Sequence, residues 1–199
     1  MTEAKRTRLT PQARREQLIE HGIGLLADTP LEQLTIEAVA DSVGVSRALL
    51  FHYFESKQDY VLELAQEQSR RLLACTEPDV TADDPMAMLR ESMSAFIDYV
   101  DRNRNAYVGL LRGPLGAERP MQEVFAQTRE VMARRVLDRA PDLGLEPTDL
   151  MVLSVYGWLA MVEEVTVAWI AGTQQVTRTE LLDLITASLP LLALAATRD

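Results

Sequence analysis

The sequence contains few of the features that indicate disulfide cross-links, β-sheets, a signal peptide or a membrane-spanning segment. Its single cysteine, Cys75, excludes a disulfide framework within one chain and is typical of a reducing cytoplasm. Only nine glycines and no alternation of apolar and polar residues favour helices over strands. The N-terminus, MTEAKRTRLTPQARREQ, lacks the apolar core of a signal peptide. Glu163 and Glu164 interrupt the most apolar stretch, so we expect no membrane segment and a cytoplasmic protein.

Residue types that support catalysis are also scarce. The chain has two histidines, His21 and His52, and contains no HExxH, CxxC, GxSxG or GxxxxGK[ST] string. The acidic pair Asp83-Asp84 lies in a linker, where it is better suited to capping the next helix than to binding a metal. We therefore expect a protein that is not an enzyme and that uses no cofactor and no metal.

The most informative pattern is residues 35–57, TIEAVADSVGVSRALLFHYFESK. Ile36 and Val39 recur at helical spacing, which predicts a short helix with one apolar face. Gly44 interrupts this pattern, and Ser46 is a favoured N-cap residue for a second short helix. Two short helices joined by a three- to four-residue turn containing glycine are typical of a helix-turn-helix, whose second helix enters the DNA major groove.

This segment resembles the DNA-reading segment of the tetracycline-repressor (TetR) family of bacterial regulators. That family shows a helix initiated by threonine, an Ala-Gly-Val-Ser turn, an aromatic–His/Tyr–Phe run, and then Ser-Lys with an acidic residue. The matching positions are Thr35, Ala40, Gly44, Val45, Ser46, Phe51, His52, Tyr53, Phe54, Ser56, Lys57 and Asp59.

The second helix carries the expected base contacts. Arg47 stands at its start, where an arginine can donate two hydrogen bonds to O6 and N7 of a guanine. Ala48 suits a thymine methyl, and the resemblance implies that Leu49 also points into the groove, in place of the usual Thr or Gly. Phe51 replaces the usual tyrosine, and we expect it in the core. The residues expected to contact DNA are Thr35, Ser46, Arg47, Ala48, Leu49, His52, Tyr53 and Lys57.

Net charge is −10, which argues against nucleic-acid binding over the whole surface. The distribution is uneven: residues 1–15 have a net charge of +4, residues 16–60 of −6 and residues 61–199 of −8. The basic arm, residues 1–9, places positive charge beside the helix-turn-helix pattern, and the local field governs docking onto a duplex.

Helical periodicity continues through the rest of the chain. It predicts helices over residues 11–27, 57–75, 85–100, 107–111, 120–140, 148–171 and 177–195, with a kink or early stop at Pro190. With the two short helices, the fold class is all-α with about nine helices. We divide it into a helix-turn-helix DNA-binding domain with the basic arm, residues 1–56, and a helical effector-binding and dimerisation domain, residues 57–199.

The resemblance implies that the second domain dimerises through its last two helices and holds a small effector between helices. The helix over residues 148–171 is apolar almost all round, and one of its strips allows close approach of another helix. The expected dimer interface is therefore Gly157, Ala160, Glu164 and Ala168.

The same helix contains two carboxylates, which are unfavourable in a buried position unless they are paired or hydrogen-bonded. One of Glu163 and Glu164 is expected to meet an arginine from the fifth, sixth or seventh predicted helix, with Arg104 and Arg112 as candidates, or to anchor a polar group of an effector; which of the two faces a pocket stays open. The residues expected to line a pocket for a lipophilic or aromatic effector are Met93, Phe96, Tyr99, Tyr107, Leu111, Phe125, Tyr156 and Glu163.

These observations predict a homodimeric transcriptional repressor that binds a pseudo-palindromic double-stranded DNA operator and is released by a small effector. A different class stays open, a helical ligand-binding or interaction protein whose helix-turn-helix does not read DNA. Leu49, Phe51 and the acidic balance of residues 16–60 favour that alternative, because affinity for DNA depends on phosphate neutralisation.

Overall fold

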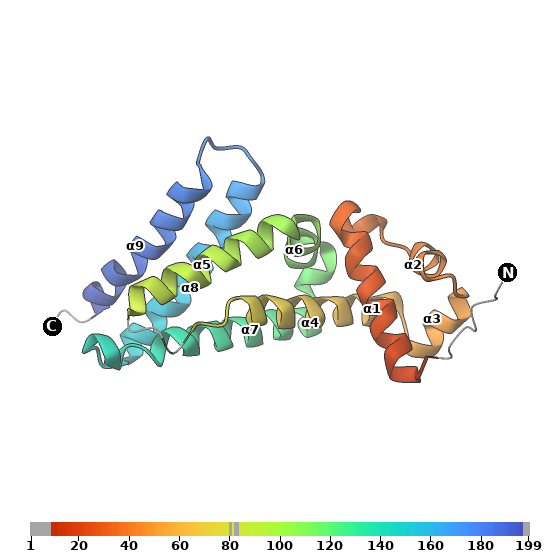
Figure 1. Cartoon of the computed structure of the whole chain (residues 1–199), viewed down its shortest axis with the longest axis horizontal. Coiled ribbons are helices and arrows are strands. Elements are labelled where there is room, and N and C mark those ends of the chain that lie inside the picture. The colour runs from red at the N-terminus through yellow and green to blue at the C-terminus, as the bar shows by residue number, and fades with distance from the viewer. Residues whose placement is uncertain (1–8, 80, 82–83, 197–199) are drawn as a thin grey trace.

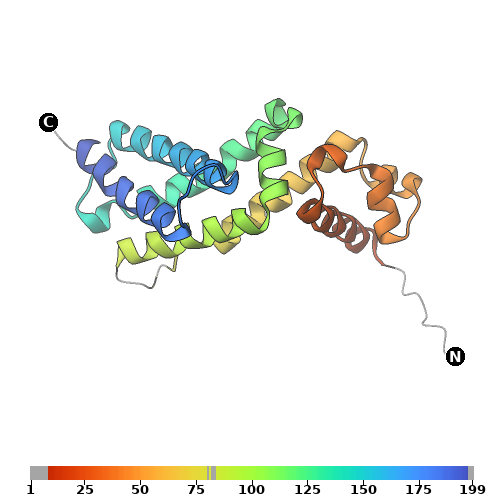
Figure 2. The same cartoon turned by 90° about the horizontal axis from the view of Figure 1, so that it is seen from above.

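The computed structural model describes residues 9–79, 81 and 84–196, so most of the predicted basic arm lies outside the described residues. Within these ranges the chain forms nine α-helices and three short 3-10 helices, and no strand. Figures 1 and 2 show an elongated molecule with a small head at one end, made by α1 (Pro11–Asp28), α2 (Ile36–Val43) and α3 (Arg47–Tyr53). The predicted all-α fold is confirmed.

The larger end, which we call the body, is a bundle of six helices. Helix α4 begins at the head and runs into this bundle, and α8 and α9 lie side by side on the part of the body away from the head (Figures 1 and 2). The bounds are α4 (Lys57–Cys75), α5 (Pro85–Arg102), α6 (Arg104–Arg112), α7 (Arg119–Leu137), α8 (Asp149–Ile170) and α9 (Arg178–Ala196), with 3-10 helices at η1 (Leu31–Gln33), η2 (Pro114–Ala117) and η3 (Pro141–Leu143). The predicted helices agree with these bounds to within about one turn.

The helices begin where the sequence provides caps. The hydroxyl of Thr10 accepts a hydrogen bond from the backbone N–H of Ala13 at 3.2 Å, and Pro11 follows it as the first helical residue. At the start of α9, the backbone N–H of Thr177 donates to Glu180 at 2.8 Å and the N–H of Glu180 donates back to the threonine hydroxyl at 3.2 Å. Such reciprocal bonds fix helix ends through local sequence alone.

Two hydrophobic clusters hold the molecule together. The first joins α1, α2, α3 and the beginning of α4, and it includes Ala106 and Leu110 of α6 and Val124 of α7. The second fills the body around Trp158, whose indole N–H donates to the carbonyl of Ile185 at 3.0 Å. Since the first cluster reaches α6 and α7, the head is packed directly onto the body, and the division of the chain at residue 56 stays a prediction.

The structure corrects the expectation for Phe51 and part of that for Pro190. Phe51 is 40% exposed instead of lying in the core, because Leu50 of α3 and Phe54 directly after it point inward and leave Phe51 on the outer side of the helix. Of the two effects predicted for Pro190, the early stop does not occur, because the proline lies inside α9 and the helix continues to Ala196; the kink stays a prediction. Buried Ala193 and Ala196 beyond the proline pack onto the body, and this packing offsets the hydrogen bond that proline cannot donate.

Candidate functional sites

The helix-turn-helix is built as its local signals predict. The hydroxyls of Thr35 and Ser46 cap α2 and α3 by accepting from the N–H groups of Ala38 at 3.1 Å and Leu49 at 3.2 Å. Between the helices Gly44 adopts φ = 68°, in the left-handed region that favours glycine. The turn is three residues long, which sets α3 across α2 in the manner of a DNA-reading helix.

The inner side of α3 is anchored by Leu50, which is fully buried. The outer side exposes four residues. Arg47 and Ala48 lie in the first turn of the helix, and Phe51 and His52 lie one turn farther along. The predicted contact residues divide accordingly: Thr35, Ser46, Arg47, Ala48 and His52 are exposed, whereas Leu49, Tyr53 and Lys57 are half-buried. Helix α3 lies at the end of the molecule farthest from the body (Figure 1), so a duplex can approach it.

Arg47 is held in place by two neighbours that the sequence did not reveal. Its guanidinium forms a 2.7 Å ion pair with Glu37 of α2 and lies over the ring of Phe51, 5.3 Å from the ring centroid. Both members of the ion pair are more than half exposed, so the pair contributes little to stability. Its effect is positional, because it aligns the arginine along the outer side of α3.

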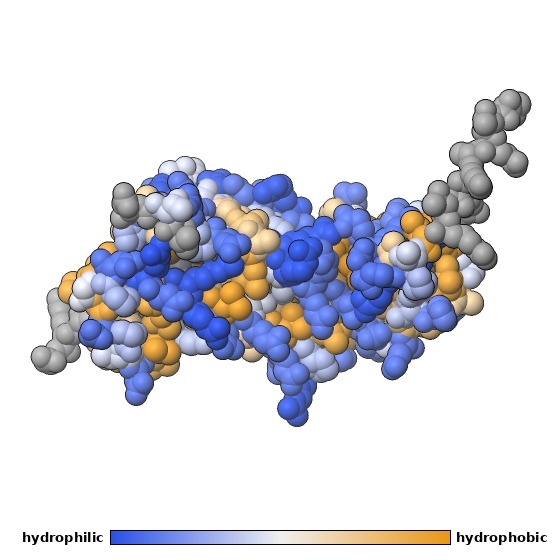
Figure 3. Space-filling view, turned by 60° about the horizontal axis from the view of Figure 1, so that its bottom comes forward, coloured by the Kyte–Doolittle hydropathy of each residue, from blue (hydrophilic) through white to orange (hydrophobic). Residues whose placement is uncertain are grey.

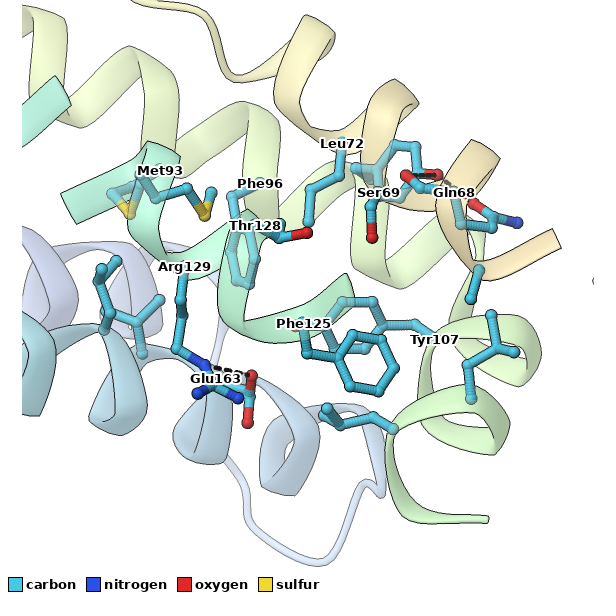
Figure 4. A pocket seen from close by; sticks show the side chains of 17 residues that line it. Gln68, Ser69, Leu72, Met93, Phe96, Tyr107, Phe125, Thr128, Arg129 and Glu163 are labelled. Atoms are coloured by element: carbon cyan, nitrogen blue, oxygen red, sulfur yellow. Dashed lines mark hydrogen bonds and ion pairs between the residues drawn. The ribbon is translucent and has the colours of Figure 1, made fainter. Parts of the chain in front are cut away.

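A cavity of about 60 Å³, the central cavity, lies inside the body between α4, α5, α6, α7 and α8 (Figure 4). Seven of the eight predicted pocket residues line it: Met93, Phe96, Tyr99, Tyr107, Leu111, Phe125 and Glu163. Tyr156 does not line it; that side chain is 38% exposed on α8. Most of the lining residues that sequence reasoning missed come from α4 and α7, and the rest from α6 and α8; they are Ala65, Gln68, Ser69, Leu72, Leu110, Thr128, Arg129, Met132, Leu159 and Val162.

One side of the central cavity is polar. Glu163 faces Arg129, with Nε and Oε2 3.7 Å apart (Figure 4). The ring of Tyr107 meets Phe96 edge to face at a centroid distance of 6.3 Å. Burial raises the pKa of Tyr107 well above its ordinary value, and the Glu163 carboxylate adds to this increase, so the phenol stays protonated and able to donate a hydrogen bond. The cavity thus joins an apolar interior to a cation, an anion and a phenol.

The second carboxylate of α8 faces a different way. Glu164 forms an ion pair with Arg112 on the surface, as one of the two candidate arginines predicted. The other candidate, Arg104, instead pairs with Asp101 at 2.5 Å. Glu163 is therefore the carboxylate that faces the cavity, and its partner Arg129 was not predicted.

Exposed apolar side chains follow one side of α8 and α9. Leu153 is 69% exposed and Leu191 68%, and the predicted interface residues Gly157, Ala160 and Glu164 are exposed beside Leu153, with Ala168 half-buried. A Cβ added to Gly157 would meet nothing within 4 Å. We call this set, together with Leu184, the α8–α9 strip. Figure 3 shows apolar patches on the end of the molecule opposite the head.

Helices α8 and α9 are also long and apolar enough to cross a membrane, with mean hydropathies of 1.5. A helix in the core of a soluble protein passes the same test, so this property alone is weak evidence.

Comparison with known proteins matches both ends of the molecule. Residues 18–64 match the family model described as bacterial regulatory proteins, tetR family, and residues 85–189 match the model described as the tetracyclin repressor-like C-terminal domain. The HTH-type transcriptional repressor KstR2 of Mycolicibacterium smegmatis is 26% identical over 165 residues, which cover 80% of each chain. The HTH-type transcriptional activator FasR of the same organism is 24% identical over 150 residues, or 74% of this chain and 68% of the relative.

Solved structures show the same fold. A tetR-family transcriptional regulator from Streptomyces coelicolor superposes with a TM-score of 0.83 at 23% identity, over 94% of this chain and 83% of that one. A regulator from Rhodococcus sp. gives a TM-score of 0.72 at 19% identity, over 91% and 99% of the two chains.

Proposed function

Because this chain belongs to the TetR family of bacterial regulatory proteins and is a DNA-binding transcriptional regulator, we propose that it is a homodimeric repressor of a pseudo-palindromic operator. The single observation that carries the proposal is the exposed outer side of α3, where Arg47 is aligned by Glu37 and Phe51. Proteins of this family are soluble, and we place this one in the cytoplasm, without a catalytic role.

The proposal is tested by selecting binding sites from randomised duplex DNA at two salt concentrations. We expect an inverted repeat whose half-sites lie about one helical turn, or a multiple of it, apart. Affinity should fall steeply as salt rises, because phosphate contacts release counterions. If no sequence is enriched at either salt concentration, the alternative of a helical binding protein that does not read DNA is favoured instead.

Substitutions of Arg47 and Lys57 should have different effects on DNA binding. Arg47→Ala should remove about 1–3 kcal/mol of discrimination at one or two base pairs and leave binding to scrambled DNA nearly unchanged. Lys57, half-buried at the start of α4, should contact phosphate, so Lys57→Ala should weaken binding to cognate and scrambled DNA alike. Competition gel shifts with both duplexes measure the ratio. An equal loss on both duplexes for Arg47→Ala would remove its assignment to base reading.

We further propose that the central cavity is the effector site. A volume of about 60 Å³ is well below the roughly 300–1,000 Å³ of small-molecule sites, so an effector must widen it. Its wall includes Ala65, Gln68, Ser69 and Leu72 of α4, the helix that begins in the head. Widening the cavity therefore displaces α4 and with it the head.

In the dimer, the two heads are spaced to fit the operator in one conformation and are not in the other. An effector releases DNA only if it binds the second conformation more tightly than the first. Saturating effector should raise the dissociation constant for the operator without changing the mass of the dimer. Release accompanied by dissociation into monomers would contradict this mechanism. Arg129, Glu163 and Tyr107 favour an effector that combines a lipophilic body with one polar group.

A further inference from the structure

A second apolar cavity lies beside the central one, farther from the head. It measures about 100 Å³ and is lined by residues of α5, α7, α8 and α9 together with Thr76, Pro78, Arg139 and Leu143 of the connecting segments. We call it the distal cavity. Met93, Met132 and Leu159 line both cavities, and Figure 4 places Met93 at the end of the central cavity opposite Tyr107. These three side chains are therefore the partition between the two spaces.

The partition is of a kind that can open. Methionine side chains are unbranched and have three rotatable bonds, so Met93 and Met132 can swing aside without moving the backbone. Neither cavity alone reaches the roughly 300 Å³ of a small-molecule site. A ligand larger than a fragment must therefore displace these methionines and occupy both spaces.

The distal cavity differs from the central one in its charge. Its charged lining residues are two arginines, Arg135 and Arg139, and among the described residues that line it there is no carboxylate. Arg139 pairs with Asp142 at 2.9 Å. Arg135 is half-buried on α7, and its Nη1 donates to two neutral acceptors, the carbonyl of Leu73 at 3.0 Å and the hydroxyl of Thr76 at 3.3 Å.

Arg135 thus places a positive charge at an apolar cavity without a carboxylate partner in the described part of the chain. A buried or half-buried charge is unfavourable without a counter-ion, and a guanidinium is well shaped to bind a carboxylate. Most of the remaining wall is apolar and includes Met86, Leu89, Trp158 and Leu189, while Thr76 and Ser92 add two uncharged hydroxyls.

We propose that the two cavities form one elongated site for an aliphatic carboxylate with a long chain. The carboxylate binds Arg135 in the distal cavity, and the chain passes between Met93 and Met132 to end near Phe125. Arg135 and Phe125 are ten residues apart on α7, which corresponds to about 15 Å along the helix axis. This inference rests on the proposed role of the central cavity as the effector site, and it adds the ligand class and the second half of the site.

The test uses a natural reporter. Trp158 is fully buried and lines the distal cavity, and the only other tryptophan is Trp169, so Trp169→Phe leaves Trp158 as the single indole. The purified full-length protein is titrated with octanoate, laurate, myristate and dodecanol while Trp158 fluorescence is recorded. We expect affinity to rise roughly three- to fourfold for each added methylene, and laurate to bind at least tenfold more tightly than dodecanol.

Arg135→Gln should abolish the preference for laurate over dodecanol while leaving dodecanol affinity unchanged. Loss of structure would instead weaken both ligands, which would contradict the assignment of Arg135. The matched control is Arg134→Gln, because Arg134 is 65% exposed and pairs with Glu130 at 2.7 Å. It should bind both ligands as the parent protein does.

Absence of a Trp158 response, affinity independent of chain length, or equal binding of laurate and dodecanol to the parent protein would each overturn the proposal. These results are separable from the proposed function, because selection of an operator from random DNA requires no ligand. A recovered operator together with failed laurate binding would remove the elongated site and leave the regulator. If laurate binds as expected but no operator is recovered, the elongated site stands and the proposed operator binding is removed.

Discussion

Leu153→Arg should convert the dimer to monomers and lower operator affinity by roughly two orders of magnitude or more. Leu153 is the most exposed large apolar residue of α8, at 69%, and is the first residue of the α8–α9 strip along this helix. In an isologous dimer each substitution occurs twice, so two unpaired guanidinium groups would enter one apolar interface. A monomer also loses the second half-site contact, whose linkage typically contributes a factor of about 10²–10⁴.

Sedimentation and gel shifts on the selected operator measure both effects. The matched control is Ala74→Arg, which adds the same charge at an exposed position on α4, away from the strip. It should remain dimeric and bind the operator normally. A dimeric Leu153→Arg protein with unchanged affinity would show that the strip is not the interface, and the dimer would have to be sought elsewhere on the body.

Features that depend on a few neighbouring residues could be predicted from the sequence. The caps at Thr35 and Ser46 and the left-handed turn at Gly44 are set by hydrogen bonds that reach no farther than five residues along the chain. The start of α9 at Thr177 and Glu180 belongs to the same class. Such signals place the helix-turn-helix on the chain before any packing is known.

Features that depend on how helices cross could not be predicted. Glu37 meets Arg47 only because of the angle between α2 and α3, and the exposed position of Phe51 follows from the same geometry. An aromatic residue on a short helix has no local signal that separates a buried position from an exposed one.

The residues that line the central cavity could be predicted only in part, because lining a cavity also depends on how the helices pack. Met93, Phe96 and Tyr107 were predicted as pocket residues because they are large and apolar. Leu72 of α4 and Met132 of α7 belong to equally ordinary amphipathic patterns, whose apolar side looks the same whether it faces a neighbour or a cavity. Arg129 was missed because the sequence does not show which of the arginines on the neighbouring helices packs opposite Glu163.

Alanine substitutions of two glycines on α1, Gly22 and Gly24, should change the unfolding free energy in opposite directions, because only Gly22 lies at the contact between α1 and α4. Gly22 is buried, and a Cβ added there would overlap the hydroxyl of Tyr60 and lie 2.9 Å from Cδ2 of Leu64. Tyr60 is fully buried and donates to the carbonyl of Leu18 at 2.7 Å. Gly22→Ala must therefore displace Tyr60, which breaks this bond and separates α1 from α4, at a cost of about 1–3 kcal/mol of unfolding free energy.

Gly24, on the same helix, has nothing within 4 Å of an added Cβ. Gly24→Ala should raise the unfolding free energy by about 0.5–1 kcal/mol, because alanine has the higher helix propensity. Urea unfolding followed by far-UV circular dichroism measures both variants. In the double variant Gly22→Ala/Tyr60→Phe the hydroxyl that causes the overlap is absent, so the loss should be smaller than the sum of the two single losses. Additive losses, or equal effects at Gly22 and Gly24, would mean that α1 does not approach α4 as closely as the Tyr60 contact requires.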